Sequence, residues 1–215
     1  KDIFNHKEIE YYATGKNLGF GAGHNLILEQ IKDSSNYHLI LNPDVYFKTE
    51  IIPILIKQLN SDETVAMIAP KVSYPNGTHQ YSCRRYPSVI ELIARKFLLL
   101  EFFLKPLIFK GTYRDLNLQE PFFAEYITGC FHLYKTKDFQ SINGFDERYF
   151  LYMEDVDICK KIDAIGKKKL YYPKVEIEHI LKRGSSKNFH LLILHISSAI
   201  KYFFKWGFSK NNTGS

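Results

Sequence analysis

The densest group of chemically useful side chains lies between Gly144 and Asp157, in the sequence GFDERYFLYMEDVD. Five carboxylates are mixed there with aromatic and aliphatic residues. A core segment rarely carries so many carboxylates, and a solvated surface segment rarely carries so many aromatic rings. The mixture therefore predicts the wall of a cleft, with apolar side chains beneath and carboxylates presented above.

Two residues elsewhere in the chain add related chemistry. Asp44 follows the short apolar run Leu39–Leu41, at the carboxyl end of a predicted strand, where ligands bind in open α/β sheets. His179 lies on a predicted strand over 170–180, on the face that its apolar neighbours share. Together with Asp155, these residues suit a hard divalent cation and a general base. The ordinary alternatives are a turn, a core histidine and a helix cap.

A glycine-rich segment, KNLGFGAGHN at residues 16–25, precedes an apolar-periodic run that predicts a helix. A glycine-rich turn before a helix can bring backbone amides close to phosphate groups. The spacing is not GxGxxG, so the dinucleotide fingerprint of an oxidoreductase is not met. A simple tight turn is the other reading of this segment.

The elements that must position these residues alternate between strands and helices. Strands are predicted over 39–41 and 65–72, with a helix from Thr49 to about Leu59 between them. This order predicts a βαβ unit with parallel strands. A further strand is predicted over 126–134, kinked at Gly129. The pattern as a whole indicates one α/β domain.

The helix predicted over 154–165, with Gly166 as its stop, begins inside the acidic segment. Glu154 and Asp155 therefore fall in its first turn, where the helix dipole favours carboxylates. The strand over 170–180 is expected to be interrupted at Pro173.

Two segments are unusually apolar. Residues 89–109 form a strongly apolar run with Arg95 and Lys96 near its middle. Such a run suits either a helix at the membrane interface or a helix buried on its own domain. Residues 188–208 predict a helix with one apolar stripe and a polar opposite side. Neither run reaches the roughly 18 uninterrupted apolar residues that a membrane span needs.

The composition sets the class of protein. With 45% hydrophobic and 24% charged residues, the 215-residue chain is an ordinary globular sequence. A net charge of +6 favours an acidic partner such as a nucleotide or an anionic membrane, and the basic residues are not clustered as in a nucleic-acid binder. Three cysteines without a CxxC pair predict neither disulfides nor a zinc site, which fits the cytosol.

Four motifs occur in one order along the chain: NLGFGAGHN, LILNPDV, TGCFHLYKTKDFQSINGFDERYFLYMEDVDICKKI and YYPKVEIEHI. In this order the sequence resembles the family-2 glycosyltransferases, and within them the rhamnosyltransferase-like branch that builds bacterial surface polysaccharides. The resemblance covers most of residues 16–186. It implies an α/β fold of GT-A type, Rossmann-like, with a mixed and mostly parallel sheet flanked by helices.

The resemblance also implies roles for particular residues. In the pair Glu154-Asp155, the second residue would be the catalytic base. Asp44 and His179 would bind Mn2+ or Mg2+, with Asn42 standing where the family has the first acidic residue of its DxD motif. The donor nucleotide would be bound by Asn17, Gly19, Gly21, Asn25, Asn42 and Asp44. The donor sugar and the acceptor would be bound near Gly129, Gly144, Phe145 and Asp146.

By this resemblance the chain is expected to be an inverting, metal-dependent glycosyltransferase. The donor would be a dTDP- or UDP-sugar, with rhamnose as one candidate, and the acceptor a saccharide, often lipid-linked, in the synthesis of O-antigen, capsule or another cell-surface polysaccharide. The expected location is the cytoplasmic face of the inner membrane, bound peripherally, without nucleic acid as a partner. A non-catalytic module that binds a nucleotide-sugar or a glycan is the alternative.

One part of the family pattern is not found before Lys1. Such enzymes begin with a strand and a DNxS-like loop that hold the base and the ribose, so we expect the N-terminal strand or strands to be missing from the sequence given. The expected organisation is a GT-A domain over residues 1–186, followed by an amphipathic helix and tail over residues 187–215.

Overall fold

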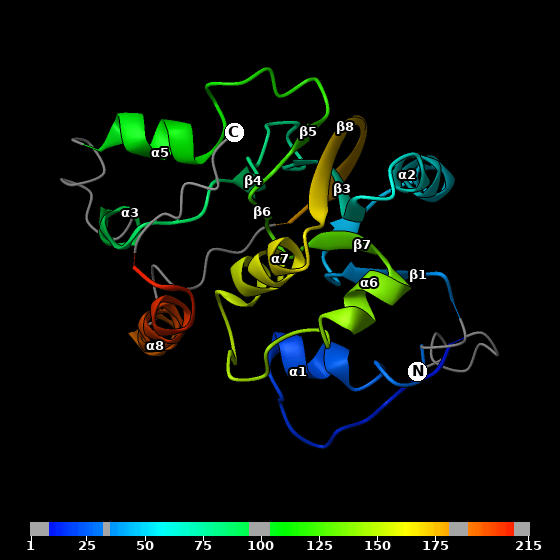
Figure 1. Cartoon of the computed structure of the whole chain (residues 1–215), viewed down its shortest axis with the longest axis horizontal. Coiled ribbons are helices and arrows are strands. Elements are labelled where there is room, and N and C mark those ends of the chain that lie inside the picture. The colour runs from blue at the N-terminus through cyan, green and yellow to red at the C-terminus, as the bar shows by residue number, and fades with distance from the viewer. Residues whose placement is uncertain (1–8, 32–34, 95–103, 181–188, 209–215) are drawn as a thin grey trace.

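The computed structural model describes residues 9–31, 35–94, 104–180 and 189–208. Within these residues the fold is built on one mixed sheet, which Figure 1 shows at the centre of the molecule. The strand order is β1-β7-β3-β8-β2, with β5 also paired to β8. These strands are β1 (Tyr37–Leu41), β2 (Val45–Tyr46), β3 (Val65–Ser73), β5 (Phe122–Phe123), β7 (Phe131–Lys135) and β8 (Lys168–His179). A separate pair consists of β4 (Cys83–Arg84) and β6 (Tyr126–Ile127).

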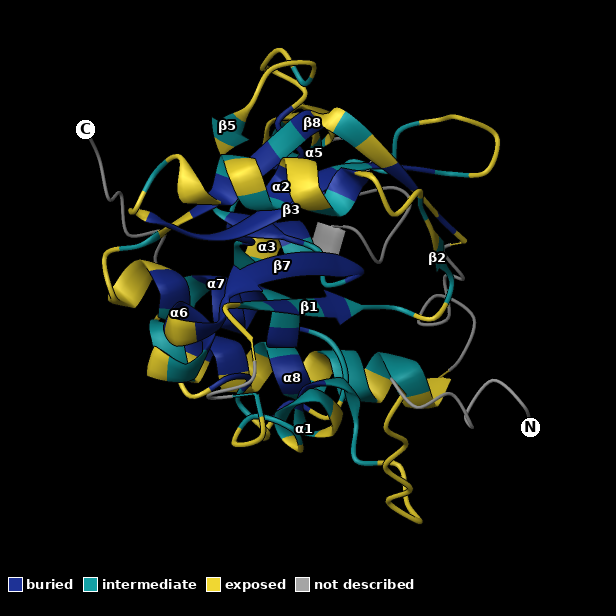
Figure 2. Cartoon of the chain, turned by 90° about the vertical axis from the view of Figure 1, so that its right-hand side faces the viewer, coloured by how far each residue is buried: buried dark blue, intermediate teal, exposed yellow. Residues whose placement is uncertain are grey.

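Helices cover both faces of this sheet (Figures 1 and 2). One apolar core lies under α2, and a second, larger core lies on the opposite face, with side chains from α6, α7 and α8. Strand β3 serves both cores because alternate side chains of a strand point to opposite faces, Met67 to one and Ile68 to the other. The helices are α1 (Phe20–Asn25), α2 (Ile51–Asn60), α3 (Val89–Ala94), α5 (Lys105–Gly111), α6 (Thr136–Ser141), α7 (Glu154–Ala164) and α8 (Phe189–Trp206).

The sheet has fewer parallel pairings than the sequence predicts. Strands β3 and β8 pair in parallel, and the other pairings of the described strands are antiparallel. The prediction that 39–41 is a strand of a parallel pair was wrong. Strand β1 is an edge strand antiparallel to β7, and two of its five residues are buried. Both β1 and β3 are antiparallel to β7 and so run in the same direction, but β7 separates them. Strand β7 begins 90 positions after β1 ends, so the local sequence around β1 carries no signal that β7 lies between β1 and β3.

Strand β8 continues through Pro173, where the sequence predicts an interruption. The register with β3 pairs Pro70 with Tyr172 and then Lys71 with Glu176, so a bulge accommodates the proline and the two residues after it. The end of β8 then pairs with β2, and this brings His179 beside the turn that carries Asp44.

Other predictions are corrected in detail. The strand predicted over 126–134 is two strands, β6 and β7, which join different sheets and are separated by the turn at Gly129. The helix expected after the glycine segment is α1, which begins inside that segment and ends before Leu26. Helix α7 is confirmed, with Gly166 at positive φ just after it. Arg95 and Lys96 lie outside the described residues.

None of the helices in the described ranges is both long and apolar enough to cross a membrane. Cys83, Cys130 and Cys159 are all buried free thiols, which confirms the prediction that they form no disulfide.

Candidate active site

Two residues with left-handed backbone conformations connect the first part of the acidic segment to helix α7. Tyr152 has φ of 68° and Met153 has φ of 67°, values that are uncommon for residues other than glycine. Such conformations cost of order 1–3 kcal/mol each, and they cluster at functional sites. Their effect here is to present Glu154 and Asp155 as the first two residues of α7.

A pocket of about 190 Å³ opens in front of this turn. It is smaller than the roughly 300 Å³ at which ligand pockets usually begin, a size that suits one sugar ring and not a whole nucleotide-sugar. Its walls come from α3, β6, α7 and α8, and thus from both of the apolar segments noted in the sequence. The lining residues are Pro87, Leu92, Tyr126, Tyr152, Met153, Glu154, Asp155, Val156 and His195.

Asp155 is held in place by backbone groups at the edge of this pocket. The amide of Val156 donates a hydrogen bond to its Oδ1 at 2.9 Å, and a Cβ at Gly129 would lie 3.4 Å from the Cβ of Asp155. Burial raises the pKa of Asp155, and the amide hydrogen bonds and the positive charge of Arg84 offset this only in part. A carboxylate with a raised pKa is a better proton acceptor than an exposed one, as a general base requires.

Glu154 is the more deeply buried member of the pair. Its Oε2 has no hydrogen-bond partner among the described residues. Burial raises the pKa of Glu154, and the negative charge of Asp155 raises it further. Two adjacent carboxyl groups with raised pKa values repel each other when both are charged, so the structure favours a protonated Glu154 beside an ionised Asp155.

Asp44 and His179 are neighbours across the pairing of β2 with β8. The register places Val45 opposite His179, and Nε2 of His179 lies 3.4 Å from Oδ1 of Asp44. Gln80 orients the imidazole: its Nε2 donates to the carbonyls of Ser73 and His179, so its Oε1 faces Nδ1 of His179 at 3.0 Å. Nδ1 therefore carries the proton, and Nε2 presents its lone pair toward Asp44.

This pair fits a divalent cation. Burial lowers the pKa of His179 more than Asp44 raises it, which keeps the imidazole in the neutral form that binds metals. An outer partner such as Gln80 is typical of metal-binding histidines. Within the described ranges no cluster of three or more His, Cys, Asp or Glu side chains forms, so a bound ion would complete its shell with water or phosphate oxygens.

The two carboxylate sites meet at Cys130. Its backbone carbonyl accepts a hydrogen bond from the amide of Asn42 at 3.0 Å, which ties the turn of Asp44 to the loop beside Asp155. Burial raises the pKa of the Cys130 thiol to about 12, and the charges of Asp155 and Asp44 both add to this effect. Asp44 and His179 do not line the pocket described above, so the two sites are distinct and each contacts the Gly129–Cys130 turn.

The glycine segment packs directly on the acidic segment. Gly19 has φ of 87°, and a Cβ there would lie 2.3 Å from the carbonyl oxygen of Phe150, so only glycine fits. A Cβ at Gly21 would lie 2.8 Å from the Cβ of Phe145. Asn17 accepts a hydrogen bond from the amide of Gly19 at 2.9 Å. These contacts give the segment a packing role, and its predicted role in nucleotide binding stays a prediction.

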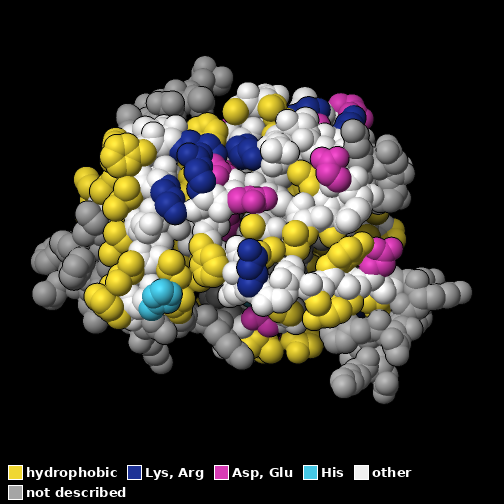
Figure 3. Space-filling model, turned by 90° about the horizontal axis from the view of Figure 1, so that it is seen from below, with side chains coloured by type: hydrophobic (Ala, Val, Ile, Leu, Met, Phe, Trp, Pro, Cys, Tyr) yellow, Lys and Arg dark blue, Asp and Glu magenta, His cyan; other side chains and the backbone are white. Residues whose placement is uncertain are grey.

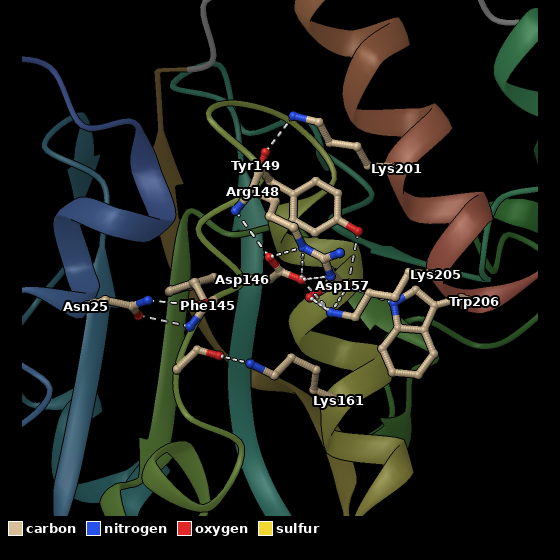
Figure 4. A network of polar contacts seen from close by, with 11 residues as sticks. Asn25, Phe145, Asp146, Arg148, Tyr149, Asp157, Lys161, Lys201, Lys205 and Trp206 are labelled. Atoms are coloured by element: carbon tan, nitrogen blue, oxygen red, sulfur yellow. Dashed lines mark hydrogen bonds and ion pairs between the residues drawn. The ribbon is translucent and has the colours of Figure 1, made fainter.

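Asn25 forms a bracket around residue 145 (Figure 4). Its Oδ1 accepts from the amide of Phe145 at 2.9 Å, and its Nδ2 donates to the carbonyl of Phe145 at 2.8 Å. Phe145 is 2% exposed, and the carbonyl of Gly144 accepts from Lys161. Phe145 is thus buried in the core and held by Asn25, and Gly144 is held by Lys161. Neither residue lines the pocket that contains Asp155.

Asp157 is the centre of a polar network that joins α7 to α8 (Figure 4). Its side chain is 0% exposed; Nζ of Lys205 lies 2.8 Å from Oδ1, and Nε1 of Trp206 donates to the same oxygen at 2.7 Å. Lys205 also contacts Asp146 at 2.7 Å. Asp146 pairs with Arg148 as well, and these hydrogen bonds hold its pKa well below the usual range. Asp146, predicted near the substrate, is therefore an ion-pair residue of this network.

Three side chains of the site were not predicted from the sequence. Gln80, in a loop, orients His179. The positive charge of Arg84, in β4, lowers the pKa of Asp155, and His195, in α8, lines the pocket. The Arg84-Arg85 pair was visible in the sequence, but nothing local indicates which arginine turns inward. The other two become neighbours of the site only through tertiary packing.

Comparison with known proteins finds similarity to glycosyltransferases. Residues 116–183 match the family described as the N-terminal domain of galactosyltransferase. The chain is 26% identical over 212 residues to "Rhamnosyltransferase WbbL" of Escherichia coli (strain K12), covering 94% of this chain and 76% of that protein. It is also 26% identical over 206 residues to "N-acetylglucosaminyl-diphospho-decaprenol L-rhamnosyltransferase" of Mycobacterium tuberculosis (strain CDC 1551 / Oshkosh), covering 89% and 66%. The resemblance stated from the motifs is confirmed.

Among solved structures, the chain is similar to GalNAc-T7 crystallised with UDP, GalNAc and Mn2+, with a TM-score of 0.57 and 14% identity. The similarity covers 81% of this chain and 32% of that one, and it is a likeness of fold. The prediction of an α/β fold of GT-A type is confirmed.

We expect Asp157→Ala to lower the free energy of unfolding by about 3 kcal/mol or more, because it removes one partner of a buried ion pair and leaves Trp206 without its acceptor. Denaturant unfolding monitored by circular dichroism would measure the change. As a control, Glu120→Ala removes the exposed pair with Lys174 and should change stability little. Equal effects of the two substitutions would contradict the role given to Asp157.

We expect Glu154→Gln to stabilise the chain at high pH and not at low pH. The pKa of Glu154 is raised from 4.5 to about 8 on folding, so stability present below pH 4.5 is lost as the pH rises through 8. The amide stays neutral, and its melting temperature should exceed that of the wild type by about 2–4 °C or more at pH 8 but match it near pH 4. Glu147→Gln, an exposed carboxylate of the same segment, should show no such pH dependence.

Proposed function

We propose, from the premise that the chain has a GT-A fold and resembles the rhamnosyltransferase-like branch of family 2, that it is an inverting glycosyltransferase. The observation that carries this proposal is Asp155. Its carboxylate lies at the start of α7, at the edge of a small pocket, and burial raises its pKa toward that of an effective base.

In the proposed reaction Asp155 accepts the proton of an acceptor hydroxyl. The hydroxyl oxygen forms a bond to the anomeric carbon of the donor sugar, while the bond from that carbon to the phosphate oxygen breaks. The diphosphate leaves with the bonding electrons, and a single displacement inverts the anomeric configuration. Glu154 stays protonated next to Asp155, so the base is the one ionised carboxylate of the pair.

Asp44 and His179 are the residues that would hold a divalent cation, Mn2+ or Mg2+. A bound cation would offset negative charge on the departing diphosphate. What the chain itself contributes is an oriented neutral imidazole: Gln80 directs Nδ1–H of His179, and Nε2 faces Asp44. Asn42, a weaker ligand than a carboxylate, begins the turn that carries Asp44: its carbonyl accepts from the amide of Val45, and its own amide donates to the carbonyl of Cys130.

The substrates are proposed from the relatives. The name of the Mycobacterium tuberculosis protein combines a lipid-linked acceptor with rhamnosyl transfer, and that of the Escherichia coli protein states rhamnosyl transfer. For this chain we propose a dTDP- or UDP-sugar donor, with rhamnose first, and a lipid-linked saccharide acceptor in cell-surface polysaccharide synthesis. The nucleotide would lie near the glycine segment and Asp44, and the acceptor in the pocket of Asp155. The proposed location is the cytoplasmic face of the inner membrane.

Asp155→Asn should lower kcat for sugar transfer by at least about 10²–10⁴-fold, the usual contribution of a general base, and leave donor affinity within about twofold. Transfer from dTDP-rhamnose and the corresponding UDP-sugars to a lipid-linked saccharide would be followed by nucleotide release, and donor affinity by calorimetry. Glu147→Gln is the matched control, because it removes an exposed carboxylate of the same segment.

Retained turnover in Asp155→Asn would contradict the base assignment. Donor binding by the wild type without transfer or hydrolysis would favour a non-catalytic binding module instead.

Gln80→Leu should weaken Mn2+ binding by about 10- to 100-fold, because it removes the partner that orients His179. Titration calorimetry with Mn2+ in the presence of UDP would measure this without relying on turnover. Gln58→Leu, at a partly exposed position of α2 that is bonded to Ser61, is the control. Unchanged Mn2+ affinity in both Gln80→Leu and His179→Ala would rule out this metal site.

A further inference from the structure

The positive charge of the chain is concentrated at its C-terminal end. Residues 181–215 contain six Lys or Arg residues and no Asp or Glu. The other 180 residues carry equal numbers of basic and acidic side chains, 23 of each. The whole formal net charge of +6 therefore belongs to the segment that contains helix α8.

Helix α8 carries two of these six basic residues, Lys201 and Lys205, and an apolar face that points to solvent. Its inner face packs on the core through Tyr202 and Phe203, while Ser198 donates to the carbonyl of Leu151. The outer face carries apolar residues at the three- and four-residue spacing of one helix stripe. The three isoleucines of the stripe are about half exposed and its two phenylalanines about three-quarters exposed: Phe189, Ile193, Ile196, Ile200 and Phe204.

An apolar stripe facing water is the reverse of the usual pattern, in which the apolar side of a surface helix faces the core. The reason is visible in the contacts of the polar side. Lys201 donates to the carbonyl of Arg148 at 2.7 Å, and Lys205 is paired with Asp146 and Asp157. Both lysines thus attach α8 to the acidic segment through their Nζ atoms, while the stem of Lys201 stays exposed, and these contacts orient the stripe outward.

Basic side chains lie next to the stripe. The side chain of Arg148 is 64% exposed although it is paired with Asp146, and Lys201, which donates to the backbone of Arg148, is also exposed. Figure 3 shows a band of hydrophobic side chains on the side of the molecule where α8 lies, with a group of Lys and Arg side chains beside it. An apolar helix face bordered by cations is the surface that binds an anionic lipid interface.

The same helix forms a wall of the pocket. His195 lines the pocket that contains Asp155, and its ring lies 4.8 Å from that of Tyr152, at the turn before α7. Ile196, the next residue, belongs to the outer stripe. A flat surface resting on the stripe would therefore lie within one helix diameter of the pocket, about 10 Å.

We propose that the outer stripe of α8 docks on the surface of an anionic lipid bilayer and places the pocket of Asp155 at the level of the lipid headgroups. Docking itself depends only on α8, and its use in presenting a lipid-linked acceptor rests on the proposed function. A second copy of the chain is the less suitable occupant, because it would bring two strongly positive segments together.

Flotation of the full chain with vesicles tests this directly. Vesicles of phosphatidylglycerol and phosphatidylethanolamine should carry the wild type upward, and pure phosphatidylcholine vesicles should carry at least tenfold less. The double substitution Ile196→Glu with Ile200→Glu should reduce binding to the anionic vesicles at least tenfold, since it puts carboxylates on the apolar stripe. Ile54→Glu, an equally apolar and exposed position on α2, should bind as the wild type does.

Three results would overturn the proposal. The stripe variant could bind anionic vesicles as well as the wild type does, or the wild type could bind both kinds of vesicle equally. The third is a wild-type dimer in light scattering that dissociates in the stripe variant, with no vesicle binding by the wild type. A melting curve close to that of the wild type shows that the variant is folded. Transfer to a water-soluble acceptor, measured on the same samples, should be unchanged in the stripe variant. Vesicle binding without any transfer would contradict the proposed function and leave the docking surface standing.

Discussion

The structure depends on one buried charge, the carboxylate of Asp157. A carboxylate removed from water is costly unless it is paired and hydrogen-bonded, and here Lys205 and Trp206 of α8 meet both needs. Because these partners come from α8, the buried carboxylate joins α7 to α8. Together with the bonds from Ser198 to Leu151 and from Lys201 to Arg148, this pairing orients α8, and it thereby places His195 in the pocket wall and the apolar stripe toward solvent.

The carboxylates of the acidic segment are divided by their surroundings between structure and chemistry. Asp146 and Asp157 are paired with cations, which tie them to the framework. Glu154 and Asp155 have raised pKa values because burial is not matched by a paired cation, and Arg84 offsets it only in part. Within twelve positions, two carboxylates thus hold the framework together and two are available for chemistry. Helix α8 supplies the cations for the first two, and the left-handed backbone at Tyr152 and Met153 presents the other two at the pocket.

The proposed metal site and the proposed base are joined by the backbone. The end of β8 pairs with β2, so His179 meets Asp44, and the amide of Asn42 binds the carbonyl of Cys130, next to the Gly129 turn against which Asp155 packs. A bulge around Pro173 keeps β8 continuous up to that pairing. This arrangement connects strand register with the chemistry, since a shift of one residue in β8 would turn His179 to the other face.

The sequence by itself determined the elements whose signals are local: α7 with its first-turn carboxylates and Gly166 stop, the buried strand β3, and the shared face of Ile177 and His179. Motif order was enough to indicate the fold and the residues that are candidates for chemistry. Tertiary structure alone decided which side of α8 faces water, which carboxylates are paired, and that β7 separates β1 from β3. These features depend on contacts between residues far apart in the chain, such as Asp157 with Lys205, and no local period or propensity records them.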